Sequence, residues 1–510
     1  MSVAPGYHRL WSLREDVHAE TDSDTGTLIL HSRWGDTELL PTTEPATLEA
    51  LRRMSFGPIL LENVTQDKAE LAAIERTLQR LEHLVVRSVA LDADRPLISV
   101  VPLTPHARFS LADLGEDRMI RLSRFAVLRT DGARYCMESP LSLHRVIFHA
   151  TEAVWSIAAL GRPARLSTIM ASALSGMNSV TAELLPYLVA AGIAVIAEPS
   201  EPGRPAVFAE DTDPALIFWK PADLMFHVRS SLGRHDEDFG MTYRFEEDVP
   251  VDPVVAPPRG GPTIDLYRPQ LQELLTVDPP FTAVVEASRQ ISRFDESIPT
   301  ARDVGELLYR TARVRSVYEE TLAGHPHATL SDRPYPTSGS CYAMEVYVAV
   351  NTCSGIPRGM YHYDPMRHRL ETLSVDDSGV DELLECGRVE AGMGTQPPLL
   401  IVITARFRRL AWKYDGLSYA LALKDLGHYT QTALLVSTAM GLAACTVAGT
   451  DIEVSARVLG TDWRTESSIA GVVIGAYADS GRRPADERDV NDAGWANEAA
   501  VILARTTRAR

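Results

Sequence analysis

The sequence predicts an α+β protein made of three blocks, and three observations lead to this prediction. Short segments rich in Val and Ile alternate with stretches in which apolar residues recur every three or four positions, which are the patterns of strands and helices. A run rich in Pro and Gly, residues 249–270, separates the last block from the others and is predicted to be a linker. A chain of 510 residues also exceeds what one hydrophobic core organises. The predicted units are residues 1–115, 118–248 and 271–500.

The first block is predicted to contain two strand pairs with two helices between them. Its clearest element is the helix at 67–81, because Leu71, Ile74, Leu78 and Leu81 recur at helical spacing. In order, the predicted elements are strands at 27–31 and 37–40, helices at 44–54 and 67–81, and strands at 84–90 and 97–103.

The second block repeats this plan. Thr130-Asp131-Gly132 between two strand patterns is a hairpin signal, and Gly192 stands where the C-cap of a helix is expected. The order helix, helix, strand, turn, strand is that of a winged helix-turn-helix, so the sequence predicts two winged-helix-like units ahead of the third block. The elements predicted for this block are strands at 124–129 and 133–137, helices at 142–160, 166–175 and 180–191, and strands at 193–197 and 206–208.

The charge of the chain argues against nucleic acid as a partner. Lys and Arg number 50 against 68 Asp and Glu, which gives a net charge of −18. Residues 166–197 contain no Lys or Arg, and the helix that would read DNA carries only Glu183 as a charged residue. A DNA reader needs cations on that face. Two functions of this block remain open. It can bind a peptide or partner protein through a strand and groove, or its role can be purely structural.

Three features of the sequence indicate where in the cell the protein is found: its cysteines, its first residues and its longest uncharged stretch. The five cysteines are scattered without a CxxC pair, and HExxH is absent, so neither a disulfide framework nor a metal site is predicted. The first twenty residues lack a basic segment followed by an apolar run, the mark of a signal peptide. The uncharged stretch Leu426–Thr450 contains His428 and Gln431, which favours a buried helix over a membrane span. We expect a cytoplasmic, reduced protein without membrane segments.

The third block mixes helices with strands rich in Val and Ile that Gly and Pro residues delimit. This pattern predicts strands covered on both faces by helices. The predicted helices are 281–291, 301–313 and 426–440, and the predicted strands are 344–351, 399–404 and 469–477.

Several polar and small residues of the third block are candidates for chemistry. Two guanidiniums and a hydroxyl, Arg289, Arg293 and Ser292, close a predicted helix and can hold a phosphate, although a solvated helix end has the same pattern. The Thr-Ser-Gly-Ser turn at 337–340 exposes backbone N–H groups and hydroxyls. The small residues at 444–451 let a flat ligand approach the backbone closely.

The adjacent residues Lys413 and Tyr414 are candidates for proton transfer. If burial lowers their pKa values, they can act as a proton acceptor and a proton donor side by side. A surface Lys beside a core Tyr gives the same pattern. Gly427-His428 is predicted to open the long uncharged helix that follows.

Several of these motifs, in this order, resemble the FMN-dependent nitroreductase family, and within it the azoline dehydrogenases of the SagB and McbC type. The Lys-Tyr pair separates these dehydrogenases from other nitroreductases. The motifs are Arg289–Phe294, Pro336-Thr-Ser-Gly339 with Tyr342-Ala-Met-Glu-Val-Tyr347, Lys413-Tyr414, Leu426-Gly-His-Tyr-Thr-Gln431 and Cys445-Thr-Val-Ala-Gly-Thr-Asp451.

The resemblance implies a nitroreductase-like domain with a mixed sheet wrapped by helices and FMN bound at a homodimer interface. It gives Lys413 and Tyr414 catalytic roles. The residues that it implies for FMN binding are Arg289, Ser292, Arg293, Pro336, Thr337, Ser338, Gly339, Gln431, Ala448, Gly449, Arg482 and Arg483.

The resemblance also implies the reaction, the oxidation of thiazoline or oxazoline rings on a ribosomally made peptide to thiazoles or oxazoles. Partners would be the azoline-containing precursor peptide and the cyclodehydratase that forms the azoline. Two other functions fit the sequence. One is a general NAD(P)H-dependent FMN reductase of nitro or quinone compounds, and the other is a flavin-free scaffold that binds a leader peptide.

Overall fold

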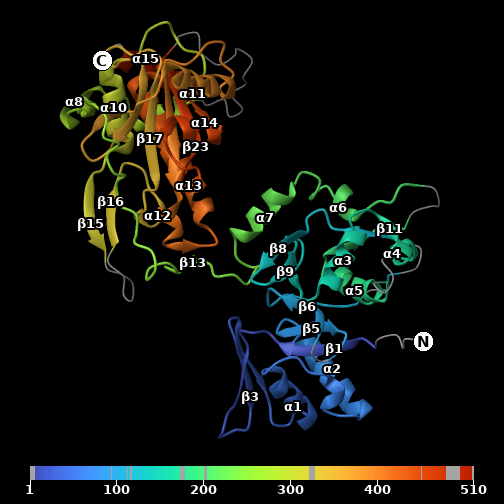
Figure 1. The fold of residues 1–510 in the computed structure, drawn as a ribbon. Helices are drawn as coiled ribbons and strands as arrows, with labels where there is room; N and C mark the ends of the chain where they lie inside the picture. The colour runs from blue at the N-terminus through green and yellow to red at the C-terminus, as the bar shows by residue number, and fades with distance from the viewer. Residues whose placement is uncertain are drawn as a thin grey trace. The chain divides into compact units, whose positions relative to one another are not determined.

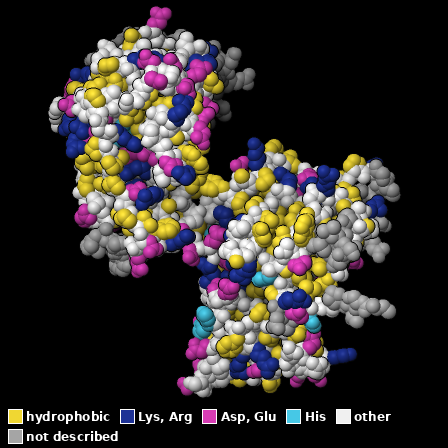
Figure 2. Space-filling view, in the orientation of Figure 1, with side chains coloured by type: hydrophobic (Ala, Val, Ile, Leu, Met, Phe, Trp, Pro, Cys, Tyr) yellow, Lys and Arg dark blue, Asp and Glu magenta, His cyan; other side chains and the backbone are white. Residues whose placement is uncertain are grey.

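The computed structural model describes residues 6–92, 95–111, 113–114, 118–172, 178–199, 204–320, 328–449, 451–477 and 494–507. The chain separates into two compact units, residues 1–237 and 238–510, which Figure 1 shows in blue to green and in green to red. On the face shown in Figure 2, acidic and basic side chains are interspersed over each unit. None of the described helices is long and apolar enough to cross a membrane.

The first unit is built on an antiparallel sheet of six strands in the order β1-β5-β6-β10-β9-β8. This sheet contains strands from both predicted N-terminal blocks, because β6 pairs with β10 through Val100 and Val146. The structure therefore differs from the prediction of separate units at 1–115 and 118–248. The strands are β1 His8–Leu13, β5 Val85–Ala90, β6 Pro96–Pro102, β8 Val127–Asp131, β9 Arg134–Glu138 and β10 His144–Phe148.

A smaller antiparallel sheet and two helices accompany the first part of this unit. The helices cover a core of Leu, Ile and Val side chains that includes Leu51, Ile74 and Leu78, so the predicted helical spacing at 67–81 is confirmed. The elements are β2 His18–Thr21, β3 Leu28–Ser32, β4 Gly35–Leu39, α1 Pro45–Met54 and α2 Lys68–Arg80, with a short 3-10 helix at Leu61–Asn63.

The second part of the unit contains a three-stranded sheet of order β11-β7-β12 and three helices against it. The three helices and the strand after them follow the predicted order, but the short strand β11 between the first two helices was not predicted. The winged-helix interpretation stays a prediction. Residues 206–208 form no strand, and their backbone carbonyls accept from Glu198 N–H at Val207 and from Asp211 N–H at Phe208. The elements are β7 Met119–Leu122, α3 Thr151–Ala159, β11 Ala164–Arg165, α4 Leu166–Ser172, α5 Asn178–Ala190, β12 Ala194–Ile196, α6 Ala209–Thr212 and α7 Pro221–Arg229.

The predicted helix 142–160 is wrong over its first half. Residues His144–Phe148 form β10, with alternate side chains buried, and the helix α3 begins only at Thr151. The run Val146-Ile147-Phe148 is apolar and partly β-branched, so it fits a strand as well as a helix. Pairing with β6 on one side and β9 on the other decides for the strand.

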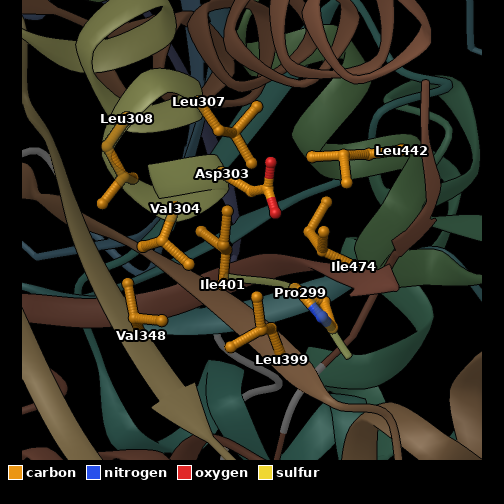
Figure 3. Close-up of a pocket in the computed structure, with 10 residues that line it drawn as sticks. All are labelled: Pro299, Asp303, Val304, Leu307, Leu308, Val348, Leu399, Ile401, Leu442 and Ile474. Carbon is orange, nitrogen blue, oxygen red and sulfur yellow. The ribbon is translucent and has the colours of Figure 1, made fainter. Parts of the chain in front are cut away.

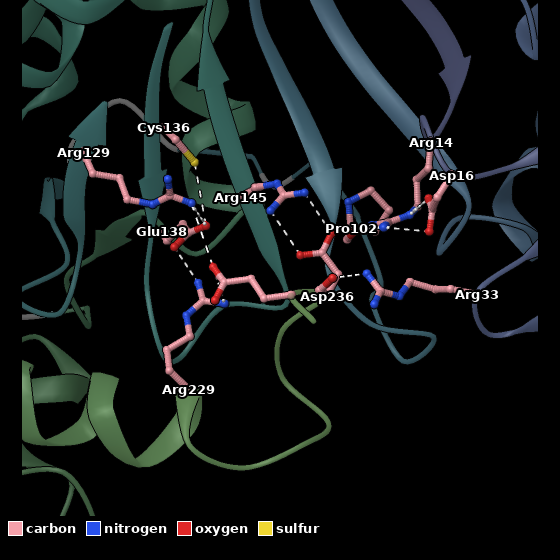
Figure 4. Close-up of polar contacts among 11 residues, drawn as sticks. Arg14, Asp16, Arg33, Pro102, Arg129, Cys136, Glu138, Arg145, Arg229 and Asp236 are labelled. Carbon is pink, nitrogen blue, oxygen red and sulfur yellow. Dashed lines mark hydrogen bonds and ion pairs between the residues drawn. The ribbon is translucent and has the colours of Figure 1, made fainter. Parts of the chain in front are cut away.

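A network of buried ion pairs fastens the end of the first unit to the six-stranded sheet (Figure 4). The carboxylate of Asp236 accepts hydrogen bonds from Arg145 at 2.8 and 3.1 Å and from Arg14 at 3.0 Å. Glu138 on β9 pairs with Arg129 and with Arg229 at the end of α7. Since a buried carboxylate is stable only when paired, these contacts hold α7 and the segment to Asp236 in place.

His144 makes the first unit sensitive to acid. Burial, and then the charge of Arg87, lower the pKa of His144 from 6.5 to about 4. The neutral ring is therefore favoured in the folded state. The resulting contribution to the free energy of unfolding is complete above pH 6.5 and is lost as the pH falls toward 4. The loss is about 3 kcal/mol, at ~1.4 kcal/mol per pH unit. Urea unfolding at pH 7.5 and 4.5 should show a smaller loss for His144→Phe than for the wild-type chain. His106→Gln, at an exposed histidine, should lose as much as the wild type.

The second unit is built on a seven-stranded antiparallel sheet of order β14-β19-β18-β17-β20-β23-β22. Alternate residues of the central strand β20 face opposite sides: Ile401 packs with α10 and α13, and Leu400 packs with α11 and α14. Helices cover both faces, as predicted. The strands are β14 Thr263–Asp265, β17 Met344–Val350, β18 Gly359–Asp364, β19 Arg369–Thr372, β20 Leu399–Arg406, β22 Leu442–Val447 and β23 Glu466–Ala476.

The remaining elements of this unit, among the described residues, are eight α-helices, a short 3-10 helix at Ser338–Ser340 and two small strand pairs, β13 with β21 and β15 with β16. The long helix α13 begins at Ser418, eight residues before the predicted start. Gly427-His428 therefore lies inside the helix and does not open it. These elements are β13 Gly240–Met241, α8 Leu271–Val277, α9 Phe281–Ala287, α10 Ala301–Ala312, β15 Ser316–Glu320, β16 Ala328–Asp332, α11 Asp377–Glu390, α12 Phe407–Ala411, β21 Tyr414–Asp415, α13 Ser418–Met440, α14 Ile452–Leu459 and α15 Trp495–Thr507.

The segment predicted to be a linker, 249–270, is bound along its length to the second unit. Three arginines donate to its backbone carbonyls: Arg409 to Asp252 O at 2.6 Å, Arg406 to Pro253 O at 2.9 Å and Arg333 to Val254 O at 3.2 Å. Further along, β14 joins the edge of the large sheet. The Pro residues of this segment prevent helix formation. The guanidiniums donate to its backbone carbonyls, which in a solvated linker would accept hydrogen bonds from water. We call residues 249–262 the strap.

Candidate functional site

Lys413 and Tyr414 lie between α12 and α13, and their surroundings are largely apolar. Lys413 is 7% exposed, and its Nζ is 3.4 Å from the carbonyl oxygen of Gly339. Burial, followed by the charges of nearby groups, raises the pKa of Tyr414 to about 12. The expectation that burial lowers this pKa is therefore wrong, because desolvation disfavours the phenolate. Tyr414 stays protonated at neutral pH and can donate a hydrogen bond.

The segment that precedes the strap fixes the backbone of this pair. Strand β13 pairs with β21 by placing Met241 opposite Tyr414, and the N–H of Tyr243 donates to Lys413 O. The ring of Tyr243 packs edge-on against Trp412, whose indole N–H donates to Val249 O at 2.9 Å. The pair is thus held from a part of the chain more than 160 residues away in sequence.

The turn at residues 336–339 lies directly against Lys413 and Tyr414. Gly339 has φ +55°, which glycine adopts without strain. A β-carbon on Gly339 would stand 2.4 Å from the Tyr414 hydroxyl and 2.9 Å from Lys413 Nζ. The structure therefore brings together Gly339, a predicted flavin-binding residue, and the two predicted catalytic residues.

Helix α13 holds this turn in place. The side chain of Asp425 accepts from both the N–H and the hydroxyl of Ser338, at 2.9 and 3.0 Å, and His428 Nδ1 is 3.1 Å from Pro336 O. The hydroxyl of Thr337 accepts from Tyr342 N–H at 3.3 Å. Both donors of Ser338 are engaged within the chain, and Asp425, which sequence reasoning missed, holds them.

The predicted phosphate-binding residues lie along a different part of the unit. Arg289 and Arg293 are exposed, Ser292 is half-buried, and neither guanidinium has a carboxylate partner within the part of the chain that the structure describes. The chain here runs beside β22, since Ile291 N–H donates to Ala444 O and the Gln290 side chain bonds Thr446. The segment thus lies beside the strand that leads to the predicted residues Ala448, which is exposed, and Gly449, which is half-buried.

Helix α13 links these two groups of residues. Its Asp425 contacts the turn at Ser338, and its Thr438 contacts Ser288 at 3.3 Å. At ~1.5 Å rise per residue these two points are about 20 Å apart along the helix axis. The predicted residue Gln431 lies between them and is exposed, while Arg482 and Arg483 lie outside the described residues.

A small apolar cavity in the second unit does not provide a ligand site (Figure 3). It lies between α10 and the sheet, is lined by side chains such as Leu307, Ile401 and Ile474, and has a volume of about 10 Å³. Such a space holds one water molecule at most. Asp303, at the edge of the cavity, forms a capping box with Thr300 at the start of α10.

Comparison with known protein families agrees with the division of the chain. Residues 288–476 match the model of the nitroreductase family, and residues 120–236 match that of the cyanobactin oxidase ThcOx. The family resemblance read from the motifs is thus confirmed, and the second unit has a nitroreductase-like α+β fold. These matches support an oxidoreductase.

Three curated relatives match parts of the chain. McbC of Escherichia coli, a microcin B17-processing protein, is 26% identical over 39% of this chain and 74% of its own length. TfxB of Rhizobium leguminosarum bv. trifolii, a trifolitoxin-processing protein, is 28% identical over 27% of this chain and 38% of its own length. MJ1384 of Methanocaldococcus jannaschii, named as a nitroreductase, is 22% identical over 37% and 85%.

Among solved structures, the chain is similar to one in the E. coli McbBCD microcin synthetase complex with truncated pro-MccB17 bound. The identity is 19%, over 52% of this chain and 96% of that one, with a TM-score of 0.31.

Proposed function

We propose that this protein is an FMN-dependent dehydrogenase that oxidises thiazoline or oxazoline rings on a ribosomally made peptide to thiazoles or oxazoles. One observation carries the proposal: a buried Lys413 stands with Tyr414 against the glycine turn of a nitroreductase-like fold. The relatives TfxB and McbC, named for processing trifolitoxin and microcin B17, support a substrate of the same kind.

The residues of this chain fit FMN at two places. The guanidiniums of Arg289 and Arg293 are exposed and without carboxylate partners among the described residues, which suits a phosphate. The positive φ of Gly339 lets the backbone approach a flat ring closely. Because these places are about 20 Å apart along α13, a site assembled from two copies of the chain accommodates both. When bound, FMN would supply the acceptor for the hydride, which carries the two electrons of the oxidation.

The chain's own residues handle the proton. The ring carbon that was the Cα of the residue loses its proton to Lys413 Nζ, while a hydride leaves the adjacent ring carbon and the ring gains a double bond. Tyr414, protonated at neutral pH, donates a hydrogen bond that orients the ring. The apolar walls around Lys413, among them Trp412 and Tyr243, exclude water from the reacting pair.

The precursor peptide and a cyclodehydratase are the partners that this reaction requires, since the azoline must be formed before it is oxidised. The region that matches the cyanobactin oxidase model, residues 120–236, is the part of the chain that we propose to engage the peptide.

The absorption spectrum of the purified protein tests the cofactor. We expect a flavin spectrum and release of FMN on heating, followed by a mass loss of two hydrogens when an azoline peptide is added. A flavoprotein that oxidises NAD(P)H rapidly and leaves the peptide unchanged would favour a general reductase. A colourless protein that FMN does not reconstitute would favour the flavin-free scaffold.

The Gly339→Ala variant tests the contact between the turn and the catalytic pair. The new β-carbon displaces the ends of Lys413 and Tyr414, so we expect azole formation per bound flavin to fall about 100-fold. Gly394→Ala is the matched control, because a β-carbon at Gly394 meets nothing within 4 Å. Equal turnover in the two variants would contradict the geometry.

A further inference from the structure

The carboxylate of Asp425 is costly to the fold. The side chain is fully buried inside α13. Its Oδ1 accepts two hydrogen bonds from Ser338, but its Oδ2, also buried, has no hydrogen-bond partner among the residues that the structure describes. Burying a carboxylate with one unpaired oxygen destabilises a protein, so stability does not explain why an acid stands here.

The hydrogen bonds that Asp425 accepts from Ser338 explain the buried acid better than stability does. Ser338 precedes Gly339, whose carbonyl oxygen is 3.4 Å from Lys413 Nζ and whose Cα faces the hydroxyl of Tyr414. Any shift of Gly339 is passed to the ends of both side chains. A displacement of about 1 Å at a reacting group can cost about 100-fold in rate.

We propose that Asp425 is a positioning residue, which holds Gly339 through Ser338 and so sets where Lys413 and Tyr414 stand relative to the reacting ring. The inference rests on the proposed function for the nature of that ring. Asp425 is also one of the lesser causes, after burial, Cys341 and Tyr243, that raise the pKa of Tyr414.

Three variants of the full chain test the role. Asp425→Ala removes both hydrogen bonds to Ser338, Asp425→Asn keeps the accepting oxygen, and Tyr429→Phe removes a fully buried hydroxyl one turn further along the same helix. We expect turnover of an azoline peptide to fall about 100-fold in Asp425→Ala and about 10-fold in Asp425→Asn. Flavin content should be unchanged in both. Tyr429→Phe should keep wild-type turnover, since it removes only a hydroxyl and keeps the ring that packs on Tyr335 ahead of the turn.

A second measurement needs no substrate. With tyrosine labelled at 13Cζ, the Tyr414 resonance is assigned from Tyr414→Phe and followed with pH by NMR. We expect the pKa of Tyr414 to be lower in Asp425→Asn than in the wild type, and unchanged in Tyr429→Phe. Asp425→Asn keeps the volume of the side chain, so it tests the role even if Asp425→Ala does not fold.

The inference is overturned if Asp425→Ala keeps wild-type turnover, if flavin content falls in step with turnover, or if the titration of Tyr414 does not change in Asp425→Asn. A wild-type chain that binds FMN and oxidises no azoline would refute the proposed function instead, and the tyrosine titration would still decide the role of Asp425.

Discussion

Replacing Lys413 with alanine is expected to reduce azole formation about 1,000-fold, within the range by which a positioned acid or base accelerates proton transfer. The flavin content should not change, because Lys413 is not among the residues proposed to hold FMN and its Nζ meets only the carbonyl oxygen of Gly339 in the turn. Peptide mass spectrometry over time gives the rate, and absorbance of the released flavin gives the content.

Two further variants sharpen this result. Tyr414→Phe removes only the hydroxyl, so we expect a smaller loss, about 10-fold, with the proton still transferred to the lysine. Lys424→Ala, at an exposed lysine on α13, is the matched control and should behave as the wild type. Retained activity in Lys413→Ala would refute the role of this lysine in catalysis.

Replacing Arg406 with methionine is expected to destabilise the second unit by about 3–5 kcal/mol, the cost of breaking a buried ion pair by removing one partner. Arg406 Nε is 3.0 Å from Glu345 Oε1, and the two side chains are 8% and 1% exposed. Burial opposes ionisation of Glu345, but Arg406 and His362 outweigh it and lower the pKa of Glu345 to about 2. The variant leaves this carboxylate without its main partner.

Urea unfolding measures the loss, and two comparisons test its cause. Adding Glu345→Gln to Arg406→Met should restore part of the stability, because no unpaired charge is then buried. Arg457→Ala breaks an exposed pair with Glu382 and should cost about 0.5 kcal/mol or less. Because the folded pKa of Glu345 is depressed, the pair stabilises fully above pH 4.5 and is lost as the pH falls toward 2.

The sequence predicted best those elements whose apolar residues follow one clear helix or strand spacing. Helices α2 and α10 and strand β20 were found within two residues of their ends. Strand β10 and the first turns of α13 were missed for tertiary reasons. Pairing with β6 makes a strand of His144–Phe148, and α13 runs through Lys424 and Asp425, which interrupt its uncharged pattern, because Asp425 finds its donors in Ser338.

The residues of the candidate site stand out one by one in the sequence, whereas their arrangement does not. Lys413, Tyr414 and Gly339 stand out as motifs, but their contact joins segments 74 residues apart, which spacing alone does not reveal. Asp425 gave no signal, since an acid on a helix is usually solvated. The packing of Tyr243 on Trp412 is likewise visible only in the structure.

The strap has a consequence for where an independently folding catalytic fragment can begin. A polypeptide starting at residue 271 would lack the carbonyls that Arg333, Arg406 and Arg409 bind, and would leave three buried guanidiniums without those acceptors. It would also lack β13 and Tyr243, on which the backbone of Lys413 and Tyr414 rests. We therefore expect the shortest independently folding form of the second unit to start near residue 238, so that it includes the segment that the sequence predicted to be a linker.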